Sequence, residues 1–515
     1  MTDIQGASKT KFPATFWVAN LMEIFERMAW YGFFAVSSLY ITNPVSEGAL
    51  GFTSQQRGTL QGVVLFILYM LPVLTGALAD RYGYKRMFII AYAVMTPSYF
   101  LLGQVHSYAG FFFVFLLVAV GAAIFKPVVV GTVARTTDES TSAMGFGIFY
   151  MVVNIGGFVG PIVASVVRGW DWKWVFVMSA LWISFNFIWV FLFYKEPTTE
   201  AGSGSARSLK KVLSDMVEVL GNWRMFLGVF FIFTILVCAT NEWITWWTCL
   251  VVTGAWVLLN LLLEIVLRAG SAPDSSWYKE PIRIGNWRFV LFLLILSGFW
   301  TTFNQIFFTL PEYIRDFVDT KDILITLRGV AGTFHLSGLA EHLQGMIDSG
   351  YQIKPELIIN IDAGAIICFQ LLVSFTMKRF PAFTTMVVGT IVAGVSVALT
   401  GWAYSGWFVI VCIVIFAFGE MAASPKSQEY IGRVAPSDKV ALFMGYYFVA
   451  IALGNLFGGI LSGVAYQKIA KDMDRPDLMW WLFGMIGFVT ALALMLYNKY
   501  VVPGWKKEMA EAQAG

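Results

Sequence analysis

Charged residues are scarce in this chain. Only 13% of its 515 residues are Asp, Glu, Lys or Arg, whereas 58% are hydrophobic and the mean hydropathy is +0.70. A soluble domain carries roughly 25% charged residues, so the deficit argues against a soluble globular protein and indicates one that crosses a membrane repeatedly. The net charge is only +3, which gives no reason to expect nucleic acid as a partner.

Cysteine and histidine are also scarce, with four and three residues respectively. The cysteines lie in apolar runs without metal-ligand spacing, so we expect no disulfide framework, no metal and no cofactor. The short polar start, residues 1–11, has no small-residue cleavage site, and we expect no removable signal peptide. The apolar runs hold no Ser-His constellation, which argues against an enzyme, and the tails are too short for the soluble domain of a sensor.

Long apolar runs, in contrast, are plentiful. A hydrocarbon core about 30 Å thick needs about 20 apolar helical residues to cross it. Two sets of six such runs, with an extra pair between them, predict an all-α membrane protein of 14 transmembrane helices: two six-helix bundles plus two inserted helices. The runs are 14–41, 56–79, 87–104, 109–134, 142–167 and 174–194, then the pair 224–240 and 243–267, then 287–311, 356–377, 383–403, 407–431, 440–466 and 478–502.

The predicted domains follow from these runs: an N-terminal bundle at 1–197, a linker with the inserted pair at 198–284, and a C-terminal bundle at 285–515. The spacing of Gly121, Pro127 and Arg135 recurs about 300 residues later, which indicates a two-half repeat. Lys and Arg gather in the loops of one side, so both termini should face the cytoplasm. The polar residues 318–354 then form a periplasmic loop, partly helical.

The first apolar run contains Glu23, Glu26 and Arg27. Each would cost at least a few kcal/mol if it faced lipid. On a helix Glu23, Arg27 and Tyr31 fall at i, i+4 and i+8, so the run presents a charged and aromatic stripe to a protein interior. Such a stripe is typical of a transporter, in which charges line a wet path and bind ions or exchange protons.

Two motifs carry a family resemblance. Residues 76–86, which include Asp80 and Arg81, resemble the signature loop of the major facilitator superfamily, where these two residues have a gating role. Residues 23–32 are similar to the Glu-x-x-Glu-Arg-Phe-x-Tyr-Tyr-Gly signature of the proton-dependent oligopeptide transporter (POT) family within it. Further matches are Phe125-Lys126-Pro127, residues 149–156, residues 419–425 and the inserted helix pair.

The resemblance implies a role for each matching residue. Arg27 and Lys126 would neutralise a peptide carboxylate, and Glu420 would meet the peptide ammonium group. Glu23 and Glu26, together with Arg27, are the candidates for proton coupling; a fixed internal ion pair of Glu23 and Arg27 is the alternative. The further candidates for substrate binding are Tyr31, Tyr69, Asn154, Trp300, Asn304, Asn360 and Asp362.

The chain departs from the family pattern where an interhelical ion pair is usual. Phe34 replaces an Arg and Asn304 replaces a Glu. Loss of one charge alone would strand the other, so a joint replacement makes physical sense, and the outer gate must close by other contacts. Asp362 could compensate as a second ammonium-binding or protonatable acid, or be a hydrated acid near the outer boundary. Glu312, Arg315 and Asp316 are expected to be solvated at the outer end of their helix, with a gate role as the alternative.

The sequence thus predicts a secondary active transporter of the bacterial cytoplasmic (inner) membrane, functional as a monomer. It would import di- and tripeptides by proton symport through alternating access, with the small peptide, protons and the lipid bilayer as its partners. The alternative is a transporter of the same fold that moves another small anion or zwitterion, a modified amino acid or drug-like molecule, with altered or absent proton coupling.

Overall fold

The computed structural model describes residues 12–138, 141–197, 222–269, 286–435 and 440–503. Their regular structure is helical, and their one β-type pairing is an isolated bridge between Asp319 and Ser405. The chain divides into two compact units, which we describe separately. Unit 1 comprises Met1–Phe34 and Leu71–Ser208, and unit 2 comprises Ala35–Met70 and Leu209–Gly515. Both ends of the predicted linker, 198–284, lie outside the described residues.

Within the described residues, the chain passes between the units at two points. Helix α1 (Ala14–Thr42) is unbroken at the boundary between Phe34 and Ala35. The second passage is at Leu71, a single residue between α2 (Ser54–Met70) and α3 (Pro72–Tyr82). Pro72 cannot donate a backbone hydrogen bond, which explains why one apolar run forms two helices rather than one. The first passage is therefore stiff and the second is a joint.

The described residues of unit 1 form the first part of α1 and five further helices. Its helices approach closely at small residues: a Cβ on Gly32 of α1 would lie 3.1 Å from the carbonyl oxygen of Gly160 of α6. Such contacts let backbones touch where a larger side chain would separate them. The five helices are α3, α4 (Tyr84–Leu102), α5 (Tyr108–Arg135), α6 (Ser142–Arg168) and α7 (Lys173–Leu192).

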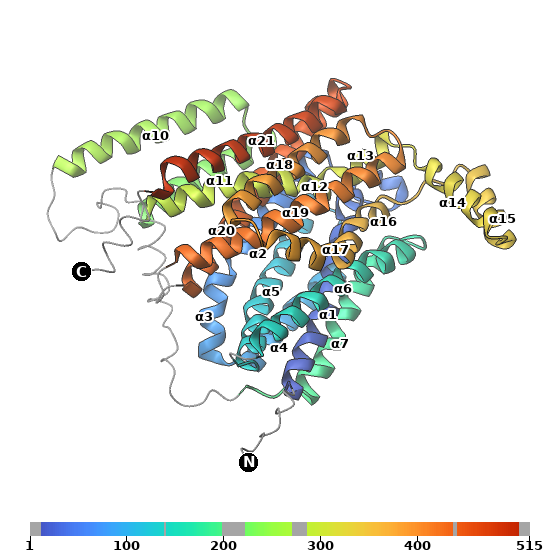
Figure 1. Cartoon of the computed structure of the whole chain (residues 1–515). Helices are drawn as coiled ribbons and strands as arrows, with labels where there is room; N and C mark the ends of the chain where they lie inside the picture. Colours follow the sequence, from blue (N-terminus) through green and yellow to red (C-terminus); the bar gives the residue numbers. More distant parts are fainter. Residues whose placement is uncertain (1–11, 139–140, 198–221, 270–285, 436–439, 504–515) are drawn as a thin grey trace, which may run out of the picture. The chain divides into compact units, whose positions relative to one another are not determined.

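Unit 2 is larger and contains the end of α1 and all of α2 (Figure 1). In it α2 packs against α20 through glycines: a Cβ on Gly58 would lie 2.3 Å from the carbonyl oxygen of Gly459. The remaining α-helices that the structure describes in this unit are α9 (Trp223–Thr240), α10 (Trp246–Ala269), α11 (Trp287–Phe303), α12 (Gln305–Phe308), α13 (Leu310–Phe317), α14 (Lys321–Thr333), α15 (Ser337–Asp348), α16 (Pro355–Ile359), α17 (Ile361–Met377), α18 (Ala382–Leu399), α19 (Gly406–Val434), α20 (Val440–Ala465) and α21 (Pro476–Tyr500).

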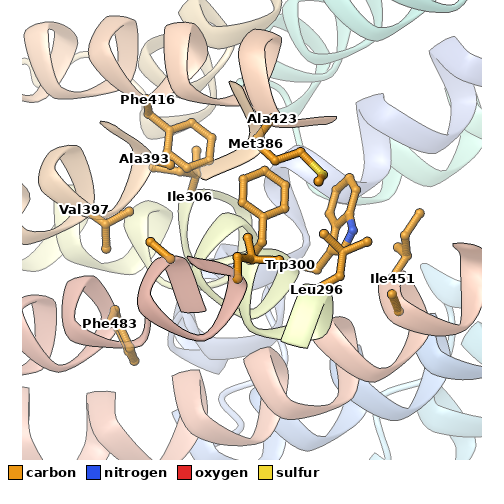
Figure 2. Packing of buried hydrophobic residues seen from close by; sticks show 14 of the residues in the cluster. Leu296, Trp300, Ile306, Met386, Ala393, Val397, Phe416, Ala423, Ile451 and Phe483 are labelled. Carbon is orange, nitrogen blue, oxygen red and sulfur yellow. The ribbon is translucent and has the colours of Figure 1, made fainter. Parts of the chain in front are cut away.

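The core of unit 2 is an apolar cluster built on α11, α18, α19, α20 and α21. Figure 2 shows Trp300 and Leu296 of α11 among Met386, Phe416 and Ile451. Burial of a side chain of this size contributes about 1.5–3 kcal/mol, so the cluster fixes how these helices pack. It thereby also fixes the end of α11, where the helix is interrupted at Asn304 before α12 begins.

The predicted outer loop, residues 318–354, is largely helical. Helices α14 and α15 form a hairpin that projects from the rest of unit 2 (Figure 1). Its two helices are held by a small buried cluster of Leu324, Ala331 and Leu343. This hydrophobic contact explains why the segment forms a hairpin rather than an irregular loop.

Eleven helices in the described part of the chain are long and apolar enough to cross a membrane. They correspond to the predicted runs from residue 109 onward, including both inserted helices. The first three runs are helical but less apolar: α1 carries three charges, the second run is broken at Leu71, and α4 begins with Lys85 and Arg86 after Tyr84. The all-helical membrane architecture predicted from the sequence is confirmed.

Candidate substrate site and closure network

The charged residues of the first helix form one buried cluster in unit 1. Glu23, Glu26 and Arg27 are 4%, 0% and 7% exposed. The Nε atom of Arg27 lies 3.2 Å from Oε1 of Glu23, and the same guanidinium pairs with Oε2 of Glu26. The second oxygen of each carboxylate is enclosed and accepts no hydrogen bond from the described residues. One cation is thus shared by two acids, each of which keeps an unused acceptor.

Lys126 and Tyr31 lie close to this cluster. Lys126, in α5, is half-buried and interacts electrostatically with Arg27, Glu23 and Glu26. The guanidinium carbon of Arg27 lies 5.7 Å from the centroid of the Tyr31 ring, within cation–π range. The structure therefore brings these five predicted residues together.

Close helix packing positions Arg27. Gly156 of α6 lies directly against it: a Cβ on Gly156 would lie 2.6 Å from Cβ of Arg27 and 2.8 Å from the carbonyl oxygen of Ile24. Asn154 lies on the same helix, and its Nδ2 donates a 2.8 Å hydrogen bond to the carbonyl oxygen of Tyr150. That local bond leaves its Oδ1 for another donor.

Two tyrosines of α4 belong to the surroundings of Glu26, and the sequence reasoning missed them. Tyr92 and Tyr99 are fully buried, and the charge of Glu26 acts on both. Their hydroxyls find no hydrogen-bond partner among the described residues. Their spacing of seven residues, which places them on one face of α4, was the available signal.

The predicted acids of unit 2 lie on neighbouring helices. Asp362, in the first turn of α17, is 4% exposed, and Glu420 lies in α19 with its Oε2 enclosed. Asn360 occupies the joint between α16 and α17 and is buried. The burial of Asp362 disfavours the interpretation of a hydrated acid near the outer boundary.

The predicted aromatic residues of unit 2 pack against α11 and α20. The ring of Trp300 lies 6.1 Å from that of Tyr447, and Tyr69 stacks on Phe448 with 6.3 Å between centroids. Asn304 follows the last residue of α11 and lies beside Gly458 of α20. Trp300 Nε1 and Asn304 Nδ2 are buried donors that no described residue accepts.

One of the two departures from the family pattern, Phe34, is accommodated by apolar packing in unit 1. Phe34 stacks on Trp30, with ring centroids 5.3 Å apart and planes inclined by 12°. An Arg at this position would lose that contact and would bury a charge. The position is thus built for an apolar side chain.

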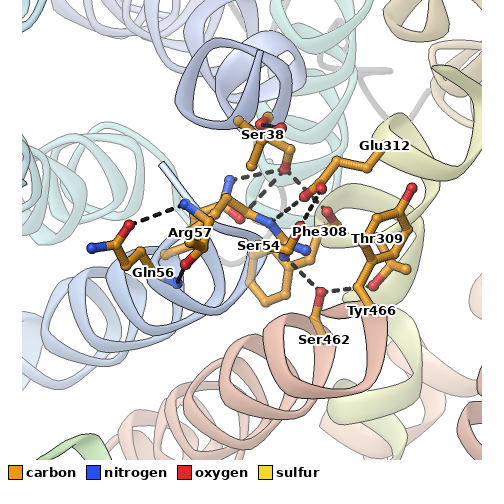
Figure 3. A network of polar contacts seen from close by, with 12 residues as sticks. Ser38, Ser54, Gln56, Arg57, Phe308, Thr309, Glu312, Ser462 and Tyr466 are labelled. Carbon is orange, nitrogen blue, oxygen red and sulfur yellow. Dashed lines mark hydrogen bonds and ion pairs between the residues drawn. The ribbon is translucent and has the colours of Figure 1, made fainter. Parts of the chain in front are cut away.

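A second buried ion pair, in unit 2, was not foreseen. Arg57 of α2 and Glu312 of α13 are joined by a 2.7 Å contact between Nε and Oε1, and neither side chain is exposed (Figure 3). Ser54 donates a 2.7 Å hydrogen bond to Oε2 of Glu312, and Nη1 of Arg57 donates one of 2.6 Å to Ser462. We call Ser54, Arg57, Thr309, Glu312 and Ser462 the closure network; within it Thr309 and Ser462 share a 2.7 Å hydrogen bond.

The expectation that Glu312 is solvated is therefore wrong. The end of α13 alone would leave this carboxylate in water, but α2 packs over it and supplies Arg57. The available signal in the sequence was Arg57, a charge at the start of the predicted run 56–79. A charge near a helix end gives no indication of its partner until the neighbouring helix is known.

Polar contacts continue beyond the closure network. Nη1 of Arg315 donates hydrogen bonds of 2.6 Å to Asn43 and 2.9 Å to Thr42, and it joins the start of unit 2 to α13. Asp316 accepts from Arg315 and, at 2.8 Å, from the hydroxyl of Tyr466. Burial opposes ionisation of Asp316, but these hydrogen bonds outweigh it and hold its pKa below the usual range.

The predicted gating residues lie at the end of α3. The side chain of Asp80 is outside the described part of the structure, whereas Arg81 is exposed with its guanidinium carbon 5.5 Å from the Tyr82 ring centroid. The next helix, α4, is capped by Glu196, whose oxygens accept from the backbone NH groups of Tyr84 at 2.6 Å and Lys85 at 2.9 Å. This cap fixes the loop to the end of unit 1.

The sequence of this chain is similar to a known family of membrane transport proteins and to individual members of it. The family model described as Major Facilitator Superfamily matches residues 21–340 and 355–514. The peptide transporter YePEPT of Yersinia enterocolitica is 20% identical over 94% of this chain and 93% of its own. The multidrug resistance protein MdtH of Salmonella arizonae is 21% identical over 90% of this chain and 89% of its own.

Solved structures of POT transporters share the fold. A POT family transporter in complex with 5-aminolevulinic acid has a TM-score of 0.68 and 18% identity, covering 95% of this chain and 97% of that one. The POT family transporter PepTSo has a TM-score of 0.69 and 17% identity, covering 96% and 99%. The matching families and relatives are transporters rather than enzymes. With the family model spanning most of its length, the chain belongs to the major facilitator superfamily.

Proposed function

We propose that this protein is a secondary active transporter that imports di- and tripeptides by proton symport through alternating access. The observation that carries the proposal is the distribution of charge. Arg27 and Lys126 stand together in unit 1, whereas Asp362 and Glu420 in unit 2 have no cationic partner among the described residues. A zwitterion carries one charge suited to each group, and a peptide is such a molecule.

The carboxylate of the peptide would be bound by Arg27 and Lys126. The planar guanidinium suits two-point binding of a carboxylate, and the ammonium of Lys126 adds a second positive charge. Tyr31, whose ring lies against Arg27, would donate to the peptide backbone. Asn154 would contribute through the oxygen that its local hydrogen bond leaves available.

The ammonium group of the peptide would be bound by Glu420, with help from Asn360. A buried carboxylate oxygen without a donor gains most from an incoming cation, because that cation replaces hydration lost on folding. Trp300, Tyr69 and Asn304 would contact the side chains of the substrate. Trp300 and Asn304 each offer an unused donor for this purpose.

Proton coupling would use the cluster of Glu23, Glu26 and Arg27. Arg27 pairs with both acids. A peptide carboxylate that binds Arg27 competes with the two glutamates, and a glutamate that loses its cation in a low-dielectric site takes up a proton. Substrate binding and proton binding would then favour each other, as symport requires.

The closure network would replace the missing ion pair of the family at the outer gate. It joins α2 of the first predicted bundle to α13 and α20 of the second, and Gly58 and Gly459 let their backbones touch. Outward opening would separate these helices, and inward opening would keep them together. Asp80 and Arg81 would act at the cytoplasmic gate.

The second candidate is a transporter of the same fold for another small anion or zwitterion. Two observations favour it: Phe34 and Asn304 replace the charged pair of the family, and relatives include a multidrug resistance protein and a structure in complex with 5-aminolevulinic acid. Both candidates use the same cations and acids. The two candidates differ in whether di- and tripeptides compete with the labelled substrate for uptake.

The test is uptake of labelled dialanine into proteoliposomes with and without an imposed pH gradient, inside alkaline. We expect concentrative uptake that a panel of di- and tripeptides inhibits. Inhibition by 5-aminolevulinic acid but by no peptide would support the second candidate. Peptide exchange that ignores the gradient would refute proton symport and leave the substrate assignment intact.

We further propose fourteen membrane-spanning segments, bundles at 1–197 and 285–515, and both termini in the cytoplasm of a bacterium, in its inner membrane. We expect a functional monomer. Cysteine accessibility at exposed positions of the α14–α15 hairpin tests the orientation, because a membrane-impermeant thiol reagent added to whole cells should label it. Protection of the hairpin in whole cells, with labelling only after lysis, would reverse the topology.

A further inference from the structure

Asp362 and Glu420 border the same apolar contact between α17 and α19. That contact is a small cluster of Ala365, Ile366, Val373, Ala417 and Met421. Asp362 lies one turn before Ile366, and Glu420 lies one turn after Ala417, so both acids project near the cluster. The charge of Asp362 acts directly on Glu420.

Neither acid is neutralised by the protein within the described residues. No described side chain or backbone group donates to Asp362 Oδ1 or Glu420 Oε2, and neither acid takes part in an ion pair there. Lys426, the basic residue that follows Glu420 on α19, pairs with Glu429 at 2.8 Å instead. Two carboxylates close together inside a protein without a cation are costly when ionised, so the pair either takes up protons or binds positive charge from outside the chain.

Charge counting distinguishes this site from the one in unit 1. There Arg27 and Lys126 balance Glu23 and Glu26, and two charges of each sign are present. In unit 2, Asp362 and Glu420 have no cationic partner among the described residues. The α-ammonium group of an ordinary peptide would supply only one positive charge to these two acids. Aromatic rings, which attract cations, lie near these acids. Tyr447 interacts electrostatically with Glu420, and its ring centroid lies 6.1 Å from that of Trp300.

We propose that Asp362 and Glu420 together bind two positive charges carried by one end of the substrate, so that the transporter prefers peptides whose N-terminal residue is Lys or Arg. The α-ammonium would bind Glu420 and the side-chain cation would bind Asp362. This preference rests on the proposed peptide transport and narrows its substrate class. Asp362 is then a specificity residue.

The test compares uptake of Lys-Ala, Ala-Lys and Ala-Ala by proteoliposomes of the full chain. Charge-assisted hydrogen bonds predict an apparent affinity about tenfold higher for Lys-Ala than for Ala-Ala, with Ala-Lys close to Ala-Ala because its second cation is at the wrong end. The ratio should fall toward one in Asp362→Asn and be largely kept in Asp362→Glu. Glu341→Gln, an exposed acid of α15, is the charge-matched control and should keep the wild-type ratio.

A second measurement separates this inference from the proposed function. Thermal unfolding in detergent with lysinamide, a dication, or alaninamide, a monocation, needs no transport. We expect lysinamide to raise the unfolding temperature more than alaninamide in the wild type, and equal effects in Asp362→Asn.

The outcomes then differ by hypothesis. Equal affinity for the three peptides, or a Lys-Ala preference unchanged in Asp362→Asn, overturns the acid-pair inference while leaving peptide transport standing. Absence of uptake of every peptide, with a lysinamide effect that depends on Asp362, overturns peptide transport and supports the acid pair. Absence of both overturns both.

Discussion

Nε of Arg57 and Oε1 of Glu312 lie 2.7 Å apart inside unit 2, although the two residues are 255 positions apart in the sequence. Neither side chain is exposed to solvent; the Ser54 hydroxyl donates to Glu312 and the Ser462 hydroxyl accepts from Arg57, while Nη2 of Arg57 finds no acceptor among the described residues. A buried pair of this kind stabilises little by itself, but each partner makes the other tolerable. The pair therefore acts as a unit.

Removing one partner of this pair should lower the stability of the folded protein more than removing both. We expect Arg57→Met or Glu312→Gln to lower stability by about 3–5 kcal/mol, because Glu312→Gln leaves Arg57 as an unpaired buried charge and Arg57→Met leaves Glu312, among the described residues, only the 3.8 Å ionic contact with Arg315. The double variant should lose less than either single one. Chemical or thermal unfolding of the purified protein in detergent measures this, and simple additivity of the two single losses would contradict the ion-pair account.

The contact between α2 and α20 should not tolerate a methyl group. A Cβ on Gly459 would lie 2.5 Å from the carbonyl oxygen of Gly58, so Gly459→Ala must push the backbones apart, at a cost of about 1–3 kcal/mol. We expect reduced uptake and greater labelling of a cysteine placed at Ser54. Gly445→Ala is the control on the same helix, since nothing lies within 4 Å of its Cβ, and equal effects of the two would refute the argument.

Helix α6 should control the position of Arg27. Gly156→Ala would place a methyl 2.6 Å from Cβ of Arg27, so α1 must shift. Because Arg27 would bind the substrate, we expect KM for peptides to rise several-fold with a smaller change in kcat. Gly147→Ala on the same helix meets no atom within 4 Å and should leave both constants unchanged. A rise in KM for both variants would mean that α6 tolerates no change at all.

The role of Glu26 in proton coupling should be separable from any role in folding. In Glu26→Gln, Arg27 keeps Glu23 at 3.2 Å and no cation is stranded. We expect uptake driven by a pH gradient to fall at least tenfold, whereas exchange of labelled for unlabelled peptide persists. The comparison of driven uptake with exchange in one preparation measures this. If the variant lost both equally, Glu26 would have a structural or substrate-binding role instead.

Asp316 predicts a pH dependence of stability. Its pKa is lowered in the folded protein by Arg315 and Tyr466 against the effect of burial, so its contribution is complete above the unfolded-state value of about 3.9 and is lost as pH falls through the lower folded value. Asp316→Asn should therefore be less stable than the wild type at neutral pH, with the difference shrinking below about pH 4. Unfolding temperatures of both proteins between neutral and acid pH would show it; a difference independent of pH would assign the effect to packing.

Much of this architecture could be predicted from the sequence because membrane helices are read from length and hydropathy alone. The cluster of Glu23, Glu26 and Arg27 was predictable for the same reason, since charges in an apolar run stand out and helical spacing puts them on one face. Asp362 was noticed in the same way. What remained open was whether water or protein surrounded it.

The closure network could not be predicted, because its partners come from distant segments. Arg57 lies at the edge of its run and Glu312 follows a proline, so each looked like an ordinary residue at a helix end. Their pairing depends on the close contact of α2 with α20, which two glycines permit. The tyrosines Tyr92 and Tyr99 were missed for a related reason: an aromatic residue on an apolar helix is usually packing.

The two passages of the chain between the units have unequal stiffness, and this has a mechanical consequence. Bending concentrates at Leu71, where Pro72 removes a backbone hydrogen bond, rather than in α1, which is continuous from Ala14 to Thr42. A rigid rod that tilts moves its two tips in opposite directions. Because α1 is continuous, a tilt of it would alter the contact of Thr42 with Arg315 and the contact of Arg27 with Gly156 together.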